Sequence, residues 1–155
     1  MDIRQDDLNS PQVVQLLQLH LDSMAPTAPP ESRHALDLTG LRDPAVTFWC
    51  VWDGQQLAGF GALKQLSPRA GEIKSMRTAP AYLRRGIAQT LLAHIEQEAC
   101  ERGYEALFLE TGAMDFFAAA RQLYLQHGYE PCPPFARYRE DPNSIFMRKN
   151  LLGCA

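Results

Sequence analysis

The stretch that most constrains this chain runs over residues 72–92, EIKSMRTAPAYLRRGIAQTLL. It begins with a short extended run, breaks at Ala79–Pro80, and passes through an Arg-Arg-Gly turn into an apolar segment with helical spacing. The first N–H groups of a helix have no partner inside it, so a strand leading through a basic glycine turn into a helix start can hold a phosphate. The stretch therefore predicts a site for a phosphate-bearing ligand.

Composition excludes several other classes of protein. The 155 residues suit a single domain, residues 1–155, with one full core. The hydrophobic fraction of 46% is that of an ordinary globular protein, and no apolar run approaches the length of a membrane span. The net charge of −3 leaves no excess of cations to neutralise nucleic-acid phosphates. We therefore expect neither a nucleic acid nor a membrane as a partner.

The potential metal and disulfide ligands are scattered along the chain. The cysteines are Cys50, Cys100, Cys132 and Cys154, and the histidines are His20, His34, His94 and His127. No CxxC pair occurs, so we expect neither a disulfide framework nor a metal site. The acidic N-terminal sequence MDIRQDDLNS resembles no signal peptide. A cytoplasmic, reducing location with structural thiols follows as the expectation.

The hydrophobic pattern predicts a mixed α+β fold, in which helices pack on the faces of a sheet. Strands are expected at residues 2–5, 47–52, 56–66, 72–78, 106–109, from 129, and at 144–149. Helices are expected at residues 11–24, 32–38, from 86 to about 102, and at 115–126. Asp53-Gly54, between two apolar runs, is the strongest hairpin signal in the chain.

The basic turn itself has two interpretations. Gly86 allows a ligand to approach the backbone closely, Ala88 is small, and Arg84 and Arg85 add positive charge for phosphate oxygens. Short glycine motifs are common, however, and the same residues fit an ordinary turn with solvated arginines.

Residues 72–92 resemble the acetyl-CoA-binding motif of the GNAT superfamily of N-acetyltransferases. That motif is a strand often ending x-V-x-P, followed by Q/R-x-x-G-x-G/A at a helix start. Here the strand ends RTAP at residues 77–80, and the turn reads LRRGIA at residues 83–88, with Leu83 in place of Gln or Arg.

A second block supports the same resemblance. Residues 117–129, FAAARQLYLQHGY, are similar to the later motif of the superfamily, N-x-x-A-x-x-L-Y-x-x-x-G-F, with Phe117 in place of Asn. The resemblance implies the GNAT acyl-CoA acyltransferase fold: a mostly antiparallel, twisted sheet of six to seven strands with about four helices on its faces. It also implies acetyl-CoA as co-substrate and no metal. The residues it assigns to the cofactor are Met76, Arg77, Thr78, Leu83, Arg84, Arg85, Gly86, Ile87, Ala88 and Ala120.

The resemblance further implies direct attack of an amine on the acetyl thioester. It assigns polarisation of the thioester carbonyl to backbone N–H around Met76, on a strand splayed from its neighbour. It assigns the general acid that protonates the departing thiolate to Tyr124. Without the motif, Tyr124 would be read as a core tyrosine on an amphipathic helix.

Two glutamates are candidates for the general base. Glu72 is the first, at the position used in the histone-acetylating branch of the superfamily, and Glu110, at the end of the next strand, is the second. Strand alternation would place Glu72, Lys74 and Met76 on one face, and a Glu72–Lys74 pair would lower the basicity of Glu72. Either glutamate could instead be solvated or structural, and a water chain could serve as the base.

The loop after residue 131 provides candidate acceptor residues. Phe135, Tyr138 and Arg139 follow a proline-rich run that could present them to a substrate, or they could pack the loop down. The expected function is an N-acetyltransferase that moves an acetyl group from acetyl-CoA to a primary amine, on a small or amino-acid-like acceptor. The alternatives are a protein N-terminus or lysine acetyltransferase, a non-catalytic acyl-CoA-binding sensor on the same fold, and a nucleotide-binding protein using the same turn. A homodimer is common among similar proteins.

Overall fold

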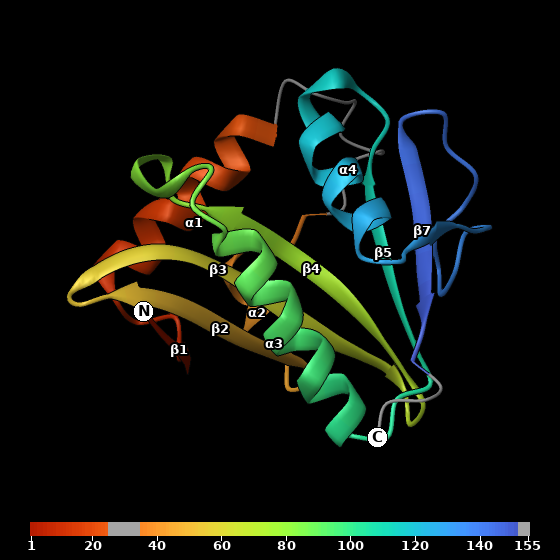
Figure 1. Ribbon diagram of the computed structural model, residues 1–155, viewed down its shortest axis with the longest axis horizontal. Helices are drawn as coiled ribbons and strands as arrows, with labels where there is room; N and C mark the ends of the chain where they lie inside the picture. Colours follow the sequence, from red (N-terminus) through yellow and green to blue (C-terminus); the bar gives the residue numbers. More distant parts are fainter. Residues whose placement is uncertain (25–34, 152–155) are drawn as a thin grey trace.

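The computed structural model describes residues 1–24 and 35–151, and these form a seven-stranded sheet in the order β1-β2-β3-β4-β5-β7-β6 (Figure 1). The strands are β1 (Asp2–Gln5), β2 (Val46–Asp53), β3 (Gln56–Ser67), β4 (Ala70–Thr78), β5 (Ala106–Gly112), β6 (Glu130–Pro131) and β7 (Ser144–Asn150). The helices are α1 (Pro11–Met24), α2 (Leu38–Leu41), α3 (Ile87–Glu101) and α4 (Ala118–Gln126), with 3-10 turns η2 (Pro80–Tyr82) and η3 (Asp115–Phe117). Only β4 and β5 pair in parallel; the other neighbours in this sheet of described residues are antiparallel. The predicted fold class is confirmed.

Helices cover both faces of the sheet. Along β2, Trp49 and Val51 pack with α3 and α4 in one buried cluster, whereas Phe48 and Cys50 pack with α1 and α2 in another. Successive strand residues point to opposite faces, so this alternation places the two helix pairs on opposite sides. In Figure 1, α3 and α4 lie in front of the strands and α1 lies behind.

Local sequence signals explain most of the elements. The β2–β3 hairpin turns at Gly54, whose φ of 58° is one that glycine adopts without strain. In α1, the buried residues Val13, Leu16, Leu17 and His20 follow helical spacing.

Two helices depart from the sequence prediction. Helix α2 begins at Leu38 rather than near residue 32, because the Asp37 side chain accepts a hydrogen bond from the N–H of Gly40 and fixes the helix start there. Residues 32–34 of the predicted helix lie outside the described residues. The last helix begins with the 3-10 turn η3 and becomes α-helical only at Ala118.

The feature of the fold that creates the site is the divergence of β4 from β5. Their pairing starts at Ala70 opposite Ala106 and stops at Ile73 opposite Leu109, although both strands continue (Figure 1). Beyond that point each strand has an edge without its neighbour, which leaves room for a ligand between them.

The cysteine prediction is wrong at one position. Cys100 is disulfide-bonded, whereas Cys50 and Cys132 are free thiols. Among the described residues, no helix is long and apolar enough to cross a membrane. In the same part of the chain, no three His, Cys, Asp or Glu side chains come together as metal ligands would.

Candidate active site

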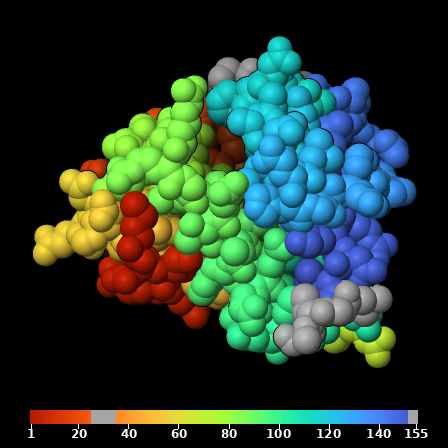
Figure 2. All heavy atoms as spheres, in the orientation of Figure 1, coloured from red at the N-terminus to blue at the C-terminus, as the bar shows by residue number. Residues whose placement is uncertain are grey.

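A cavity of about 920 Å³ opens where β4 and β5 diverge. Its wall is made by β4 and β5, the starts of α3 and η3, helix α4, and the end of α1. In Figure 2 the surface is hollowed between the green spheres of the α3 start and the cyan spheres of η3 and α4. Nine of the ten residues predicted to bind the cofactor line the cavity. They are Met76, Arg77, Thr78, Leu83, Arg84, Gly86, Ile87, Ala88 and Ala120.

One end of the cavity is the turn at Gly86. Arg84 and Gly86 both have left-handed backbone angles, with φ of 62° and 79°, and α3 begins immediately after them without a side-chain cap at Gly86. An added Cβ at Gly86 would meet no described atom within 4 Å, so the backbone is open to a ligand. The turn and the first N–H groups of α3 therefore form an open anion site.

The two turn arginines have different positions. Arg84 lines the cavity. Arg85, the tenth predicted cofactor residue, is not part of the cavity wall, and its guanidinium carbon lies 4.8 Å from the centre of the Tyr82 ring. Arg85 thus forms a cation–π contact with Tyr82, and Arg84 is the arginine of this turn that faces the cavity.

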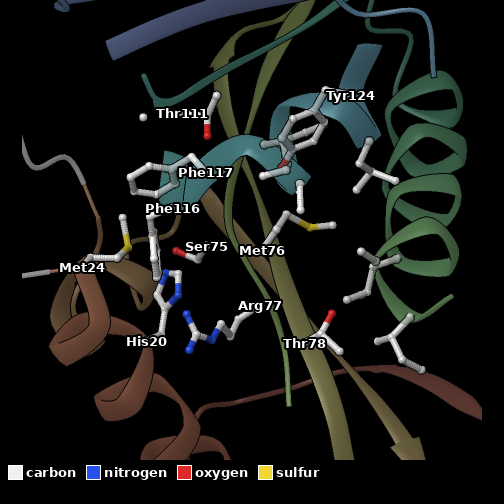
Figure 3. A pocket seen from close by; sticks show the side chains of 18 of the residues that line it. His20, Met24, Ser75, Met76, Arg77, Thr78, Thr111, Phe116, Phe117 and Tyr124 are labelled. Atoms are coloured by element: carbon white, nitrogen blue, oxygen red, sulfur yellow. The ribbon is translucent and has the colours of Figure 1, made fainter. Parts of the chain in front are cut away.

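The middle of the cavity contains a β-bulge in β4. Phe60 pairs with Arg77 and Ala62 pairs with Lys74, so Ser75 and Met76 together face one residue of β3. Ser75 has a φ of 58°, which is unusual for a residue other than glycine. In Figure 3 the Met76 side chain points toward α3.

The bulge overturns one prediction. Met76 packs against the buried cluster of α3, whereas Lys74 bonds to Glu72 and to Tyr138 of the loop after β6. Met76 therefore does not share a face with Glu72 and Lys74, since the extra residue shifts the alternation by one.

Tyr124 reaches the cavity from α4. It is buried, its ring packs edge-to-face on Tyr129 at 5.6 Å, and in Figure 3 its hydroxyl points into the cavity toward Met76. Burial raises the pKa of Tyr124, because the anionic phenolate is poorly solvated there. The hydroxyl therefore keeps its proton at neutral pH and is available as a donor.

The two candidate bases lie in one polar cluster. Glu72 is only 2% exposed, and its Oε2 accepts hydrogen bonds from Lys74 Nζ at 3.2 Å and from the Tyr138 hydroxyl at 2.5 Å. Glu110 also lines the cavity. Burial raises the pKa of Glu110, and the Ser144 hydroxyl and the Lys74 charge offset only part of this rise.

The chain shares these features with known proteins. The family model of the Acetyltransferase (GNAT) family matches residues 13–129. The chain belongs to the GNAT acetyltransferase family. It is 56% identical to YsnE of Bacillus subtilis, named an uncharacterized N-acetyltransferase, over 97% of this chain and 100% of that protein.

Solved GNAT structures have the same fold. A chain from Klebsiella pneumoniae assigned as an acyl-CoA N-acyltransferase is 30% identical, with a TM-score of 0.80 over 97% of each chain. A GNAT family acetyltransferase from Elizabethkingia anophelis with acetyl-CoA bound is 17% identical, with a TM-score of 0.70 over 96% of this chain and 97% of that chain. The protein is thus an acyltransferase with the GNAT fold.

The predicted acceptor residues do not form the cavity wall of this GNAT protein. Phe135 packs its ring against Phe108 and Phe146, at 4.9 and 5.9 Å. Arg139 is exposed and lies outside the wall. Tyr138 contacts the site indirectly, through its hydrogen bond to Glu72. The loop is packed down onto the sheet, which was the alternative interpretation of its sequence.

Several residues of the GNAT cavity were missed by sequence reasoning. They are His20, Met24, Ser75, Thr111, Phe116, Phe117 and Asn143. His20 had a recognisable signal, because it is the polar member of an otherwise apolar stripe on α1. Among the others, Ser75 lies in the β4 bulge and Phe116 and Phe117 lie in the short turn η3, where no long periodic pattern indicates which way a side chain points.

Proposed function

We propose that this N-acetyltransferase uses acetyl-CoA as its donor and a primary amine of a small molecule as its acceptor. The observation that carries the proposal is the continuity of one cavity from the Gly86 turn, past Tyr124, to Glu110. An open anion site, a buried proton donor and a half-buried carboxylate then lie along one path between β4 and β5.

The donor assignment rests on the Gly86 end of the cavity. The N–H groups at the start of α3 and the Arg84 side chain suit a diphosphate, which needs several donors and positive charge. The unpaired edge of β4 from Lys74 onward suits an extended, amide-bearing chain, because a strand edge offers N–H and C=O groups for pairing. The acetyl-CoA bound to the Elizabethkingia relative supports this donor.

The reaction needs one group to give a proton and another to accept one. The acceptor nitrogen attacks the thioester carbonyl carbon, a C–N bond forms, and the C–S bond breaks. Tyr124 protonates the departing sulfur, and the bulge at Met76 presents backbone N–H to the carbonyl oxygen as it gains negative charge. Both residues border the same cavity.

For the general base we propose Glu110 in place of the first candidate, Glu72. Both bonds to Glu72 Oε2 would have to rearrange before that oxygen accepted a further proton. Burial raises the pKa of Glu110, which brings this carboxyl closer to the range in which a base accepts a proton from an ammonium. Lys74 and Tyr138 then hold the Glu72 side chain in place at this end of the cavity.

The proposal is tested by following release of free CoA thiol from acetyl-CoA across a panel of amines. The panel contains amino acids, aliphatic and aromatic amines, polyamines and short peptides with free N-termini. Turnover of one or more small amines is the expected result. Binding of acetyl-CoA without turnover of any panel member, or turnover of peptides alone, would contradict the proposal.

A further inference from the structure

The cavity wall formed by α1 and the end of β4 contains a linked set of polar groups. Arg77 Nη1 donates to Ser23 Oγ at 2.9 Å, and that hydroxyl donates to the backbone oxygen of His20 at 2.9 Å. In Figure 3 Arg77 lies beside His20, on the opposite side of β4 from the Met76 side chain. The Arg77 side chain therefore faces away from α3, where the proposed donor binds, and toward the remaining part of the cavity.

Arg77 carries a positive charge that no described carboxylate neutralises. None of the ion pairs formed by residues 1–24 and 35–151 includes it, and its described hydrogen bond goes to a neutral hydroxyl. The residue is half-buried, and burial lowers the pKa of its guanidinium. The end of α1 offers only a partial negative charge to a full cation. A partly desolvated guanidinium without a carboxylate partner among the described residues favours an anion with two oxygens.

His20 adds a second unsatisfied group to this wall. The side chain lines the cavity and is only 7% exposed, and its Nδ1 has no hydrogen-bond partner among the described residues. Burial, followed by the charge of Arg77, lowers the pKa of His20 to about 4, so the ring is neutral at pH 7. A neutral ring adds no competing charge, and its Nδ1 is a polar atom of the cavity wall with which a bound ligand can form a hydrogen bond.

The surroundings of this polar wall are apolar. Met24, Phe116 and Phe117 line the same cavity, and Figure 3 shows Met24 and both phenylalanines on the side where His20 lies. Phe116 is 52% exposed although it is a large apolar residue. An apolar body bound here would cover that ring and release ordered water.

We propose that Arg77 binds a carboxylate of the acceptor, and that the acceptor is an amino acid with an apolar side chain. This inference rests on the proposed function and extends it to a substrate class. Glu72 of β4 and Glu110 of β5 lie near the point where the pairing of the two strands ends, and Arg77 lies further along β4, where it is no longer paired with β5. A zwitterion matches this arrangement, with its ammonium toward the carboxylates and its carboxylate toward the guanidinium.

Matched ligands test the inference by binding rather than by turnover. Phenylalanine and 2-phenylethylamine differ by the carboxylate alone, and so do leucine and 3-methylbutylamine. Each is titrated calorimetrically into CoA-saturated wild-type protein, Arg77→Gln and Arg77→Lys. Arg69→Gln is the control, since the Arg69 side chain is 77% exposed and its ion-pair partner is Glu105.

We expect the wild type to bind each amino acid at least about 10-fold more tightly than its decarboxylated partner. Arg77→Gln should weaken binding of the amino acids by about 10- to 100-fold and change the simple amines by less than about 2-fold. Arg77→Lys should retain part of the affinity, because it keeps the charge but loses the planar fork. Arg69→Gln should bind like the wild type.

Equal binding of the members of each pair would overturn the inference, as would an Arg77→Gln variant that weakens amines and amino acids alike. The binding readout also separates the inference from the proposed function. Amino acids bound through Arg77 but never acetylated would contradict the function alone. Amines acetylated with no preference for a carboxylate would contradict the inference alone.

Discussion

The Tyr138 hydroxyl donates a hydrogen bond to Glu72 Oε2 over 2.5 Å, and the Lys74 ammonium contacts the same oxygen at 3.2 Å. Tyr138 comes from the loop after β6, so this contact ties that loop to β4, the strand that borders the cavity. It also gives the buried Glu72 and the half-buried Glu110 different surroundings. Glu72 has two donors on one oxygen, whereas burial raises the pKa of Glu110. Environments that differ in this way are how an active site assigns different roles to similar groups.

The first prediction concerns the pH dependence of turnover. Glu110→Gln should lower kcat/KM by about 100-fold at neutral pH, because the amine loses its general base. A base works only when deprotonated, and burial raises the pKa of Glu110 above the ordinary 4.5. Wild-type kcat/KM should therefore fall as the pH drops through that raised value, and Glu110→Gln should lose this acidic limb. The measurement is thiol release as a function of pH.

Two further variants control this experiment. Glu72→Gln leaves Lys74 and Tyr138 with a neutral partner, so it should alter KM or stability but keep the acidic limb. Glu105→Gln changes an exposed side chain, so it should leave KM, stability and the acidic limb unchanged. If the limb disappears in Glu72→Gln and persists in Glu110→Gln, the roles of the two glutamates are reversed.

The second prediction separates chemistry from donor binding. Tyr124→Phe should lower kcat by about 100- to 1,000-fold, because the departing thiolate loses its proton donor. The dissociation constant for CoA should change by less than about 2-fold, since the ring remains. Tyr129→Phe is the matched control, because the Tyr129 ring packs on Tyr124, the residue is also buried, and its hydroxyl has no partner among the described residues. Equal activity of Tyr124→Phe and Tyr129→Phe would remove Tyr124 from the mechanism.

Features that depend on short stretches of sequence could be predicted from the chain alone. The Asp53-Gly54 hairpin, the apolar stripe of α1 and the turn at Gly86 each need only a few neighbouring residues. The mixed fold followed from the order of such elements and is confirmed. Sequence motifs also selected residues that the structure brings to one cavity, from Gly86 to Tyr124.

Features that depend on pairing between distant residues could not be predicted. The bulge at Ser75 exists only in the register of β4 against β3, and it reverses the side that Met76 faces. The approach of Arg77 to Ser23 joins residues that are 54 positions apart. Aromatic packing of Phe135 against Phe108 and Phe146 favours the packed-down interpretation of its loop, and this contact joins residues far apart in the sequence.

The third prediction distinguishes the two arginines of the turn. Arg84→Ala should weaken CoA binding by about 10-fold and reduce its dependence on salt, because the removed charge faces the cavity. Arg85→Ala should have a smaller effect, since its guanidinium lies over the Tyr82 ring. Calorimetric titration of CoA at low and high salt measures both. An unchanged dissociation constant for Arg84→Ala at both salt concentrations would remove this residue from the phosphate site.

The fourth prediction concerns stability in acid. His20 has a pKa of about 4 in the folded chain against an ordinary 6.5. Between these two pH values the unfolded chain binds a proton at His20 and the folded chain does not. His20 should therefore contribute about 3 kcal/mol to the free energy of unfolding above pH 6.5. This contribution should be lost as the pH drops from 6.5 through 4. Urea unfolding at a series of pH values measures this slope.

Two substitutions of His20 separate titration from packing. His20→Gln keeps a polar side chain and His20→Leu keeps an apolar one, and neither side chain titrates. The two variants should differ from each other in absolute stability, but both should show a flatter decline between pH 6.5 and 4 than the wild type. A decline as steep as in the wild type in both variants would mean that another group takes up the proton. His20 would then not be the group that stays neutral beside Arg77, and its support for the carboxylate site would be lost.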